Sequence, residues 1–215
     1  GEMMILGLTG SIGMGKSTAA NNFRRLGIPV HGADKAVHEL LAENGEAAPR
    51  IKDLFPDTVN KGTLDREQIA KKVFADAQAL AWIEELLHPM VRRREQTFLG
   101  RAARQGRSLV VLDIPLLFET GGEVRCDAVV TVSAPKFIQQ QRVLKRQGMT
   151  RERFDTILGR QIPDAEKRRR ADFVVLTGLG RDFSLRQILN LVRITSRWRG
   201  TKWPPRPDVR GKIIA

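Results

Sequence analysis

Residues 4–18 read Met4-Ile-Leu-Gly-Leu-Thr-Gly-Ser-Ile-Gly-Met-Gly-Lys-Ser-Thr18. Residues 4–9 form a short apolar run that ends in a glycine-rich turn, which is typical of a buried strand. A helical pattern follows over residues 16–26. Residues 10–17 fit G-x-x-x-x-G-K-[ST] at every fixed position, between this strand and this helix. The stretch therefore predicts a phosphate-binding loop (P-loop) within an α/β fold.

The chemistry of such a loop depends on its backbone. The glycines let the chain curl so that several N–H groups point at phosphate oxygens, and the helix N-terminus adds its dipole. Lys16 is expected to reach the β- and γ-phosphates of a nucleoside triphosphate, and the Ser17 hydroxyl to ligate Mg²⁺. The loop thus predicts a donor nucleotide. It leaves the acceptor open, because GTPases, motors, ATPases and small-molecule kinases share this motif.

Further runs of aliphatic residues follow at residues 28–31, 109–113, 128–132 and 173–176. The last three lack polar alternation, as strands buried on both faces do. Helical stretches such as residues 136–146 and 185–197 separate the strands, and this alternation indicates a parallel sheet. We therefore predict a three-layer α/β/α sandwich of the P-loop NTPase fold with about five parallel strands.

Two long segments fall outside this core pattern. Between Asp34 and Leu109 there is no convincing strand, and the connection is too long for an ordinary crossover, so we predict a helical substrate-binding insertion. Residues 142–170 are rich in arginine and are broken at Gly148 and Pro163, which predicts a mobile basic lid. The predicted parts are a nucleotide-binding core of residues 1–34, 97–139 and 171–198, an insertion of residues 35–96, a lid of residues 140–170 and an extended basic tail of residues 199–215.

The composition limits the location of the protein. The 215 residues are 41% hydrophobic, which suits one core with a small accessory lobe. No run approaches the roughly 18–20 apolar residues of a membrane-spanning helix, and the N-terminus lacks the pattern of a signal peptide. Cys126 is the single cysteine of the sequence and fits a reducing compartment. We expect a cytoplasmic protein with no membrane partner, monomeric or weakly self-associated.

The net charge of +13 raises the alternative of a nucleic-acid partner. However, the sequence has no tyrosine, and no basic run is interleaved with aromatic residues that would stack bases. Small, highly phosphorylated substrates explain part of the charge equally well. We expect no nucleic-acid partner, although a nucleic-acid-binding P-loop ATPase stays open as an alternative to a small-molecule kinase.

Two acidic residues follow predicted strands. Asp34 comes after the second strand, where a carboxylate could take the proton of an incoming hydroxyl, but aspartate is also a favoured N-cap. Asp113 ends the strand of residues 109–113 and suits a role in holding Mg²⁺, although an aspartate there can simply cap a turn. Both ends lie where open α/β sheets gather their ligands.

Histidines and arginines give weaker signals. His88-Pro89 is predicted to end a helix, where a lone histidine is more often a helix-end cation than a catalyst. The other histidines have no third ligand at metal spacing, so no zinc site is predicted. Arg92, Arg142 and Arg146 could line a solvated helix face, yet a kinase needs cations over the transferring phosphoryl group, which a closing lid can supply.

Several clusters, in order along residues 4–178, together resemble dephospho-CoA kinase. After residues 5–18 come Gly32-Ala-Asp34, Gly62-Thr-Leu-Asp-Arg66, His88-Pro89 with Arg92, Asp113-Ile-Pro-Leu-Leu-Phe-Glu119, Gln141-Arg142 with Lys145-Arg146, and Arg160-Gln161-Ile-Pro163 with Lys167 and Ala171-Asp172. The pieces after the P-loop are individually weak, but their ordered set is specific.

The resemblance implies transfer of the γ-phosphoryl group of ATP to the 3′-hydroxyl of the ribose of dephospho-CoA, with Mg²⁺. Asp34 would act as base, with Lys16 and Arg142 stabilising charge. The implied nucleotide-binding residues are Gly13, Met14, Gly15, Lys16, Ser17, Thr18 and Arg146. The implied acceptor-binding residues are Asp34, Arg66, His88, Arg92, Asp113, Leu117 and Glu119, and the implied metal ligands are Ser17 and Asp113. A kinase for another nucleoside or nucleotide is the alternative within enzymes.

Two positions depart from the family pattern. The family usually has Asp-Ala-Asp where this chain has Gly32-Ala-Asp34, so one carboxylate is missing while the proposed base remains. The family also tends to carry asparagine after the last strand, and the corresponding position here is Thr177. Thr177 can still form hydrogen bonds, but its departure affects the loop expected to contact adenine.

Overall fold

The computed structural model describes residues 2–205. Its strands are β1 (Met4–Thr9), β2 (Val30–Gly32), β3 (Val59–Asn60), β4 (Thr63–Leu64), β5 (Leu109–Asp113), β6 (Ala128–Ser133) and β7 (Phe173–Leu176). Its α-helices are α1 (Lys16–Arg25), α2 (Ala33–Leu40), α3 (Ala48–Leu54), α4 (Arg66–Ala75), α5 (Ala77–Arg104), α6 (Lys136–Leu144), α7 (Arg151–Gly159), α8 (Asp164–Arg170) and α9 (Arg181–Thr195). Over this range the chain forms two compact units, residues 2–32 with 99–205, and residues 33–98.

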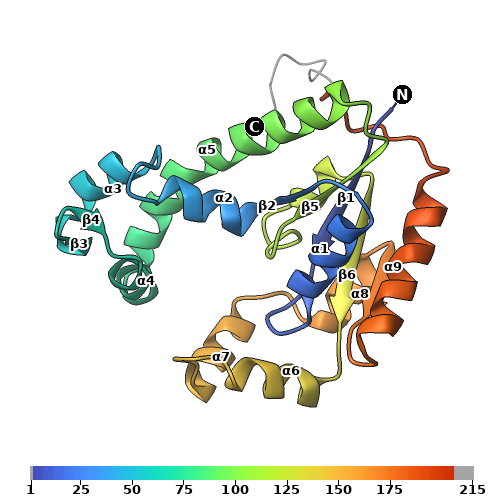
Figure 1. Ribbon diagram of the computed structural model, residues 1–215. Coiled ribbons are helices and arrows are strands. Elements are labelled where there is room, and N and C mark those ends of the chain that lie inside the picture. The colour runs from blue at the N-terminus through green and yellow to red at the C-terminus, as the bar shows by residue number, and fades with distance from the viewer. Residues whose placement is uncertain (1, 206–215) are drawn as a thin grey trace. The chain divides into compact units, whose positions relative to one another are not determined.

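The first unit is built on a five-stranded parallel sheet with the order β2-β5-β1-β6-β7 (Figure 1). All residues of β1 and β6 are buried, as the unbroken aliphatic runs predict. Because side chains alternate along a strand, Met4, Leu6 and Leu8 share one face, where they join the apolar residues of α1 and α9 in one core. The predicted fold class is confirmed.

The opposite face of the sheet is covered by the segment between β5 and β6 and by α8. Gly7 in β1 leaves room for Leu117 and Cys126, and a Cβ at residue 7 would lie 2.7 Å from Leu117 Cδ2 and 2.8 Å from Cys126 Sγ. Cys126 is buried shortly before β6, where it packs as a small apolar residue. α8 packs on β6 and contributes the fully buried Lys167. The sheet therefore has layers on both faces.

The second unit has its own apolar core, and the prediction that it lacks strands is wrong. Its helices bury Leu40, Ile51, Phe55, Ile69, Ile83 and Leu87, among others. The short strands β3 and β4 form an antiparallel hairpin, with positive φ angles of 49° at Lys61 and 85° at Gly62. Such two-residue turns need left-handed conformations, which glycine adopts without strain.

The predicted helix end at His88-Pro89 is also wrong, because α5 runs through Pro89. A proline inside a helix removes one hydrogen bond to the residue four positions earlier, which here is Glu85. Both Glu85 and Pro89 are exposed, so water can bond the carbonyl that the proline leaves unpaired. The apolar stripe of Ile83 and Leu87 keeps the helix packed across this defect.

The start of the predicted tail is described only as far as residue 205. Thr201 donates its N–H to Asp127 Oδ1 at 2.6 Å, and its Oγ1 lies 3.1 Å from the same oxygen. The other carboxylate oxygen of Asp127 accepts the N–H of Ile5 at 2.8 Å. The chain after α9 is thereby fixed to β1, and residues 206–215 of the predicted tail lie outside the described residues.

Candidate active site

The P-loop joins β1 to α1 as predicted, and its glycines are required by the geometry. Gly15 precedes the first residue of α1 with φ 92°, and a Cβ there would lie 2.9 Å from Thr177 Oγ1. A side chain at this position would therefore be both strained and crowded. Lys16 and Ser17 form the first turn of α1, which directs its N-terminal amides out of the helix.

The P-loop amides fall into two groups. The N–H of Met14 donates to Ser11 O at 3.1 Å, and that of Ile12 donates to Gln161 Oε1 at 3.1 Å. Within residues 2–205, by contrast, no acceptor bonds the amides of Gly13, Gly15, Lys16 and Ser17. This second group forms a row of donors at a helix N-terminus, which is the arrangement that binds phosphate.

Lys16 and Asp113 form an ion pair next to these amides. Asp113 ends β5, and it is in register with Leu8 of β1 and Gly32 of β2. The Lys16 and Asp113 side chains are only 16% and 14% exposed. The structure thus brings together two residues that the sequence assigned separately, one to phosphate and the other to Mg²⁺.

The segment after β5 packs back on the sheet. Ile114 donates its N–H to Leu8 O at 3.0 Å, and Thr9 Oγ1 donates to Pro115 O at 2.9 Å. Leu117 is fully buried beside Gly7, whereas Leu116 is 40% exposed. Leu117 therefore belongs to the core in this structure, since burial on the sheet leaves it no surface for a substrate.

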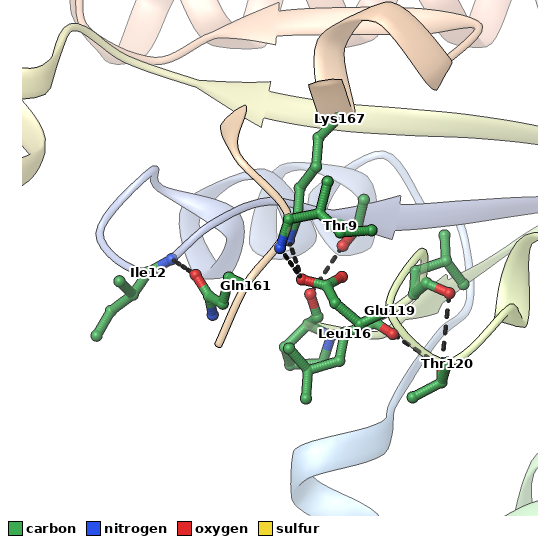
Figure 2. Close-up of polar contacts among 10 residues, drawn as sticks. Thr9, Ile12, Leu116, Glu119, Thr120, Gln161 and Lys167 are labelled. Atoms are coloured by element: carbon green, nitrogen blue, oxygen red, sulfur yellow. Dashed lines mark hydrogen bonds and ion pairs between the residues drawn. The ribbon is translucent and has the colours of Figure 1, made fainter. Parts of the chain in front are cut away.

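Glu119, at the end of this segment, contacts the stretch that leads from α7 into α8. Its Oε2 accepts the N–H of Ile162 at 3.0 Å and lies 3.0 Å from Lys167 Nζ (Figure 2). The Glu119 side chain is 13% exposed and that of Lys167 is 0% exposed. Glu119, which the resemblance assigns to the acceptor, is thus paired with a buried ammonium group.

Arg142, near the end of α6, lies against the P-loop. It donates to Thr177 O at 2.8 Å, to Thr177 Oγ1 at 3.1 Å and to Gly13 O at 3.3 Å. Thr177 Oγ1 in turn donates to Met14 O. The structure therefore brings Arg142 to the P-loop, whereas Arg146 is exposed.

The remaining predicted site residues lie in the second unit. Asp34 is an exposed residue in the first turn of α2, two positions after the end of β2, so it is not the N-cap residue. Arg66 is the first residue of α4, and its Nη2 donates to His38 O at 3.0 Å. Arg92 pairs with Glu95 at 2.6 Å, and His88 is exposed on α5.

Sequence reasoning missed the side chains that hold the P-loop backbone. Gln139 Nε2 donates to Ile12 O at 2.8 Å, and Gln161 accepts the N–H of the same residue. Gln161 belongs to a motif that we quoted but to which we assigned no role. In the sequence, Gln139 stands out only as a polar residue on the apolar side of a predicted helix. In the structure, Gln139 is only 4% exposed.

Open P-loop amides at the edge of a parallel α/β sheet, with a lysine beside them, define this protein as a nucleotide-binding protein of the P-loop class. Among the helices of residues 2–205, none combines the length and apolar character that a membrane crossing requires. A sequence model of the dephospho-CoA kinase family matches residues 4–179. This chain therefore belongs to the dephospho-CoA kinase family.

Individual relatives agree with this assignment. The dephospho-CoA kinase of Mesorhizobium japonicum is 53% identical over 178 residues, which cover 83% of this chain and 89% of the relative. That of Rhodospirillum rubrum is 50% identical over 210 residues, covering 95% of this chain and 99% of the relative.

Solved structures share the fold. The crystal structure of TT1252 from Thermus thermophilus is 36% identical, with a TM-score of 0.79 and coverage of 90% of this chain and 98% of that one. A dephospho-CoA kinase from Campylobacter jejuni has a TM-score of 0.67 over 89% of this chain and 96% of its own. At 24% identity, that structure supports the fold alone.

Proposed function

We propose that this chain transfers the γ-phosphoryl group of ATP to the 3′-hydroxyl of the ribose of dephospho-CoA, which gives coenzyme A. The observation that carries the proposal is the family match from residue 4 to residue 179, which spans the P-loop, the Asp113–Glu119 segment and the arginine-rich segment. The open P-loop amides beside Lys16 support the donor half of the reaction. The acceptor half rests on family membership.

The donor phosphates would be bound by Gly13, Met14, Gly15, Lys16, Ser17 and Thr18. Backbone amides of this loop would bond the phosphate oxygens, and Lys16 would stabilise the charge that develops on transfer. Lys16 pairs with Asp113 in the structure, so this ion pair would have to open as Lys16 turns to the nucleotide. Arg142 would add a cation from the end of α6, with Arg146 further along the chain.

Ser17 and Asp113 would hold Mg²⁺. Their hydroxyl and carboxylate oxygens are the ligands this ion prefers, and Mg²⁺ is commonly bound by one or two protein groups together with substrate phosphates. The donor chemistry therefore fits the ion. When bound at these residues, Mg²⁺ would supply positive charge that offsets the negative charge of the donor phosphates during transfer.

Asp34 would accept the proton of the acceptor hydroxyl. Its position in the chain supports this role, because β2 ends at Gly32, which is in register with Asp113 of β5. Gly32 stands where the family usually has a carboxylate, so Asp34 would act without that neighbour. Asp34 is exposed at the start of α2, and this position supports its proposed role in proton transfer.

Residues 35–96 would receive the acceptor, and residues 140–170 would form the lid. Arg66, His88 and Arg92 are the candidate acceptor ligands, and arginine suits the phosphate groups of a CoA precursor. A cytoplasmic monomer or weak homo-oligomer is proposed, for which size-exclusion chromatography is the test.

One assay tests the function. The protein is incubated with ATP, Mg²⁺ and dephospho-CoA, and coenzyme A is detected by mass spectrometry. A panel of nucleosides, nucleotides and shikimate serves as alternative acceptors. Formation of coenzyme A is expected, and preference for another acceptor would refute the proposal.

A further inference from the structure

Both backbone groups of Ile12 in the P-loop are bonded by glutamine side chains. The N–H donates to Gln161 Oε1 at 3.1 Å, and the carbonyl accepts from Gln139 Nε2 at 2.8 Å. Gln139 lies in α6 and Gln161 lies between α7 and α8. The peptide that precedes the open amides is therefore held by residues on either side of α7.

A second set of contacts fixes the backbone next to Gln161. Ile162 donates its N–H to Glu119, and Lys167 of α8 lies 3.0 Å from the same carboxylate oxygen (Figure 2). Gln161 and Ile162 are adjacent in the chain. The carboxylate of Glu119 thus fixes the backbone at Ile162, directly after Gln161. The Gln161 side chain extends from this backbone to the P-loop.

The chemistry of the Glu119–Lys167 pair favours a positioning role over a stabilising one. Lys167 is fully buried, and within residues 2–205 no acceptor other than Glu119 pairs with its ammonium group. Glu119 Oε1 is buried and has no hydrogen-bond partner in the same range. A buried ion pair with few other hydrogen bonds contributes little net stability, because desolvation offsets the attraction, but it fixes geometry.

We propose that Glu119 is a positioning residue for nucleotide binding. Together with Lys167, it fixes Ile162, which places Gln161 against Ile12 and so orients the open amides that follow. The proposal rests on the proposed function and replaces the expectation that Glu119 binds the acceptor. It assigns roles to Lys167 and Gln161 as well, and both belong to the motif around residues 160–172.

Steady-state kinetics with each substrate varied separately test the idea. Gln161→Met removes the acceptor of the Ile12 N–H at similar volume, and it is expected to raise KM for ATP about tenfold, the effect of about 1.4 kcal/mol. KM for dephospho-CoA should stay within about twofold. Glu119→Gln keeps an oxygen for Ile162 but removes the charge facing Lys167, so it should raise KM for ATP by a smaller factor. Gln105→Ala, at an exposed position directly after α5 and outside every proposed site, is the matched control and should change neither constant.

A double variant tests whether Glu119 and Gln161 affect ATP binding through the same contact with Ile12. Glu119→Gln combined with Gln161→Met should raise KM for ATP no more than Gln161→Met alone, because both act through Ile12. Multiplied effects would overturn the proposal. A Glu119→Gln variant that raises KM for dephospho-CoA and leaves KM for ATP unchanged would overturn it too, since Glu119 would then touch the acceptor.

Two further measurements distinguish a loss of folding from a loss of nucleotide binding. If Glu119→Gln fails to fold, Gln161→Met decides alone, because it removes no buried charge. ATP and ADP affinities measured by calorimetry without acceptor should weaken about tenfold in Gln161→Met, and unchanged affinities would overturn the proposal. The absence of coenzyme A with the wild-type protein would refute the proposed function alone, because these affinities would still report on the P-loop.

Discussion

Replacing Thr177 with valine should weaken nucleotide binding through the P-loop carbonyl of Met14. Thr177 Oγ1 donates to this carbonyl and accepts from Arg142 Nη1 at 3.1 Å. The residue is 8% exposed, so water would not fully replace the lost hydroxyl. Valine keeps the branched shape beside Gly15, and the variant therefore isolates the hydrogen bonds from the packing.

The size of the effect follows from the groups left unpaired. A buried acceptor without a partner costs about 1–3 kcal/mol. Arg142 would lose less, because it keeps its bonds to Thr177 O at 2.8 Å and Gly13 O at 3.3 Å. If about 1.4 kcal/mol of this cost weakens the binding free energy of ATP, the affinity for ATP falls about tenfold. The remainder lowers the free energy of unfolding.

Calorimetric titration with ATP and with ADP measures the affinity, and urea unfolding measures the stability. Thr156→Val is the matched control, since the Thr156 hydroxyl also donates to a backbone carbonyl, that of Glu152 at 2.8 Å, but in α7. Thr177→Asn, which introduces the residue usual in the family, should bind ATP within about threefold of wild type because its amide can both donate and accept. Loss of stability in Thr177→Val with unchanged affinity for both nucleotides would refute the reasoning.

Three other variants test the proposed site. Asp34→Asn should lower kcat about 10²-fold or more while ATP affinity is kept, as for loss of a general base, and unchanged turnover would remove Asp34 from the mechanism. Lys16→Met should lower kcat/KM for ATP about 10²–10³-fold, the scale for one lost charge-stabilising donor, and a change below tenfold would contradict its role. Glu119→Ala should destabilise the fold by about 3–5 kcal/mol, because it leaves the Lys167 ammonium buried and unpaired. Urea unfolding checks this, and Glu119→Gln with Lys167→Met should regain most of the loss.

The sheet and the P-loop could be predicted because their signals are local. The runs at residues 4–9, 109–113, 128–132 and 173–176 were aliphatic without alternation, and each is a strand of the parallel sheet. The hairpin of β3 and β4 was missed because each strand has only two residues, too few to show a period. The only local signal for it was the turn at Lys61-Gly62.

The ion pair of Lys16 with Asp113 could not be predicted from local patterns. The two residues are 97 positions apart, and they meet because β5 lies beside β1 in the sheet. The sequence indicates where the strands are but not which strands lie side by side in the sheet. Lys16 and Asp113 were therefore assigned separate roles. The same limit applies to Glu119 and Lys167, whose pairing depends on how α8 packs on the sheet.

The basic character of residues 140–170 shows why composition predicts this site poorly. Much of this charge is neutralised within the first unit, by Arg151 with Asp155, Arg168 with Asp164, Arg169 with Glu166, Arg170 with Glu123 and Lys167 with Glu119. Within residues 2–205, no carboxylate pairs with Arg142 of α6 or with Lys145 and Arg146, which directly follow this helix. Because α6 carries both Arg142 and Gln139, which bond the P-loop, the cation that the structure brings to this loop is placed by one short helix and not by the arginine-rich segment as a whole.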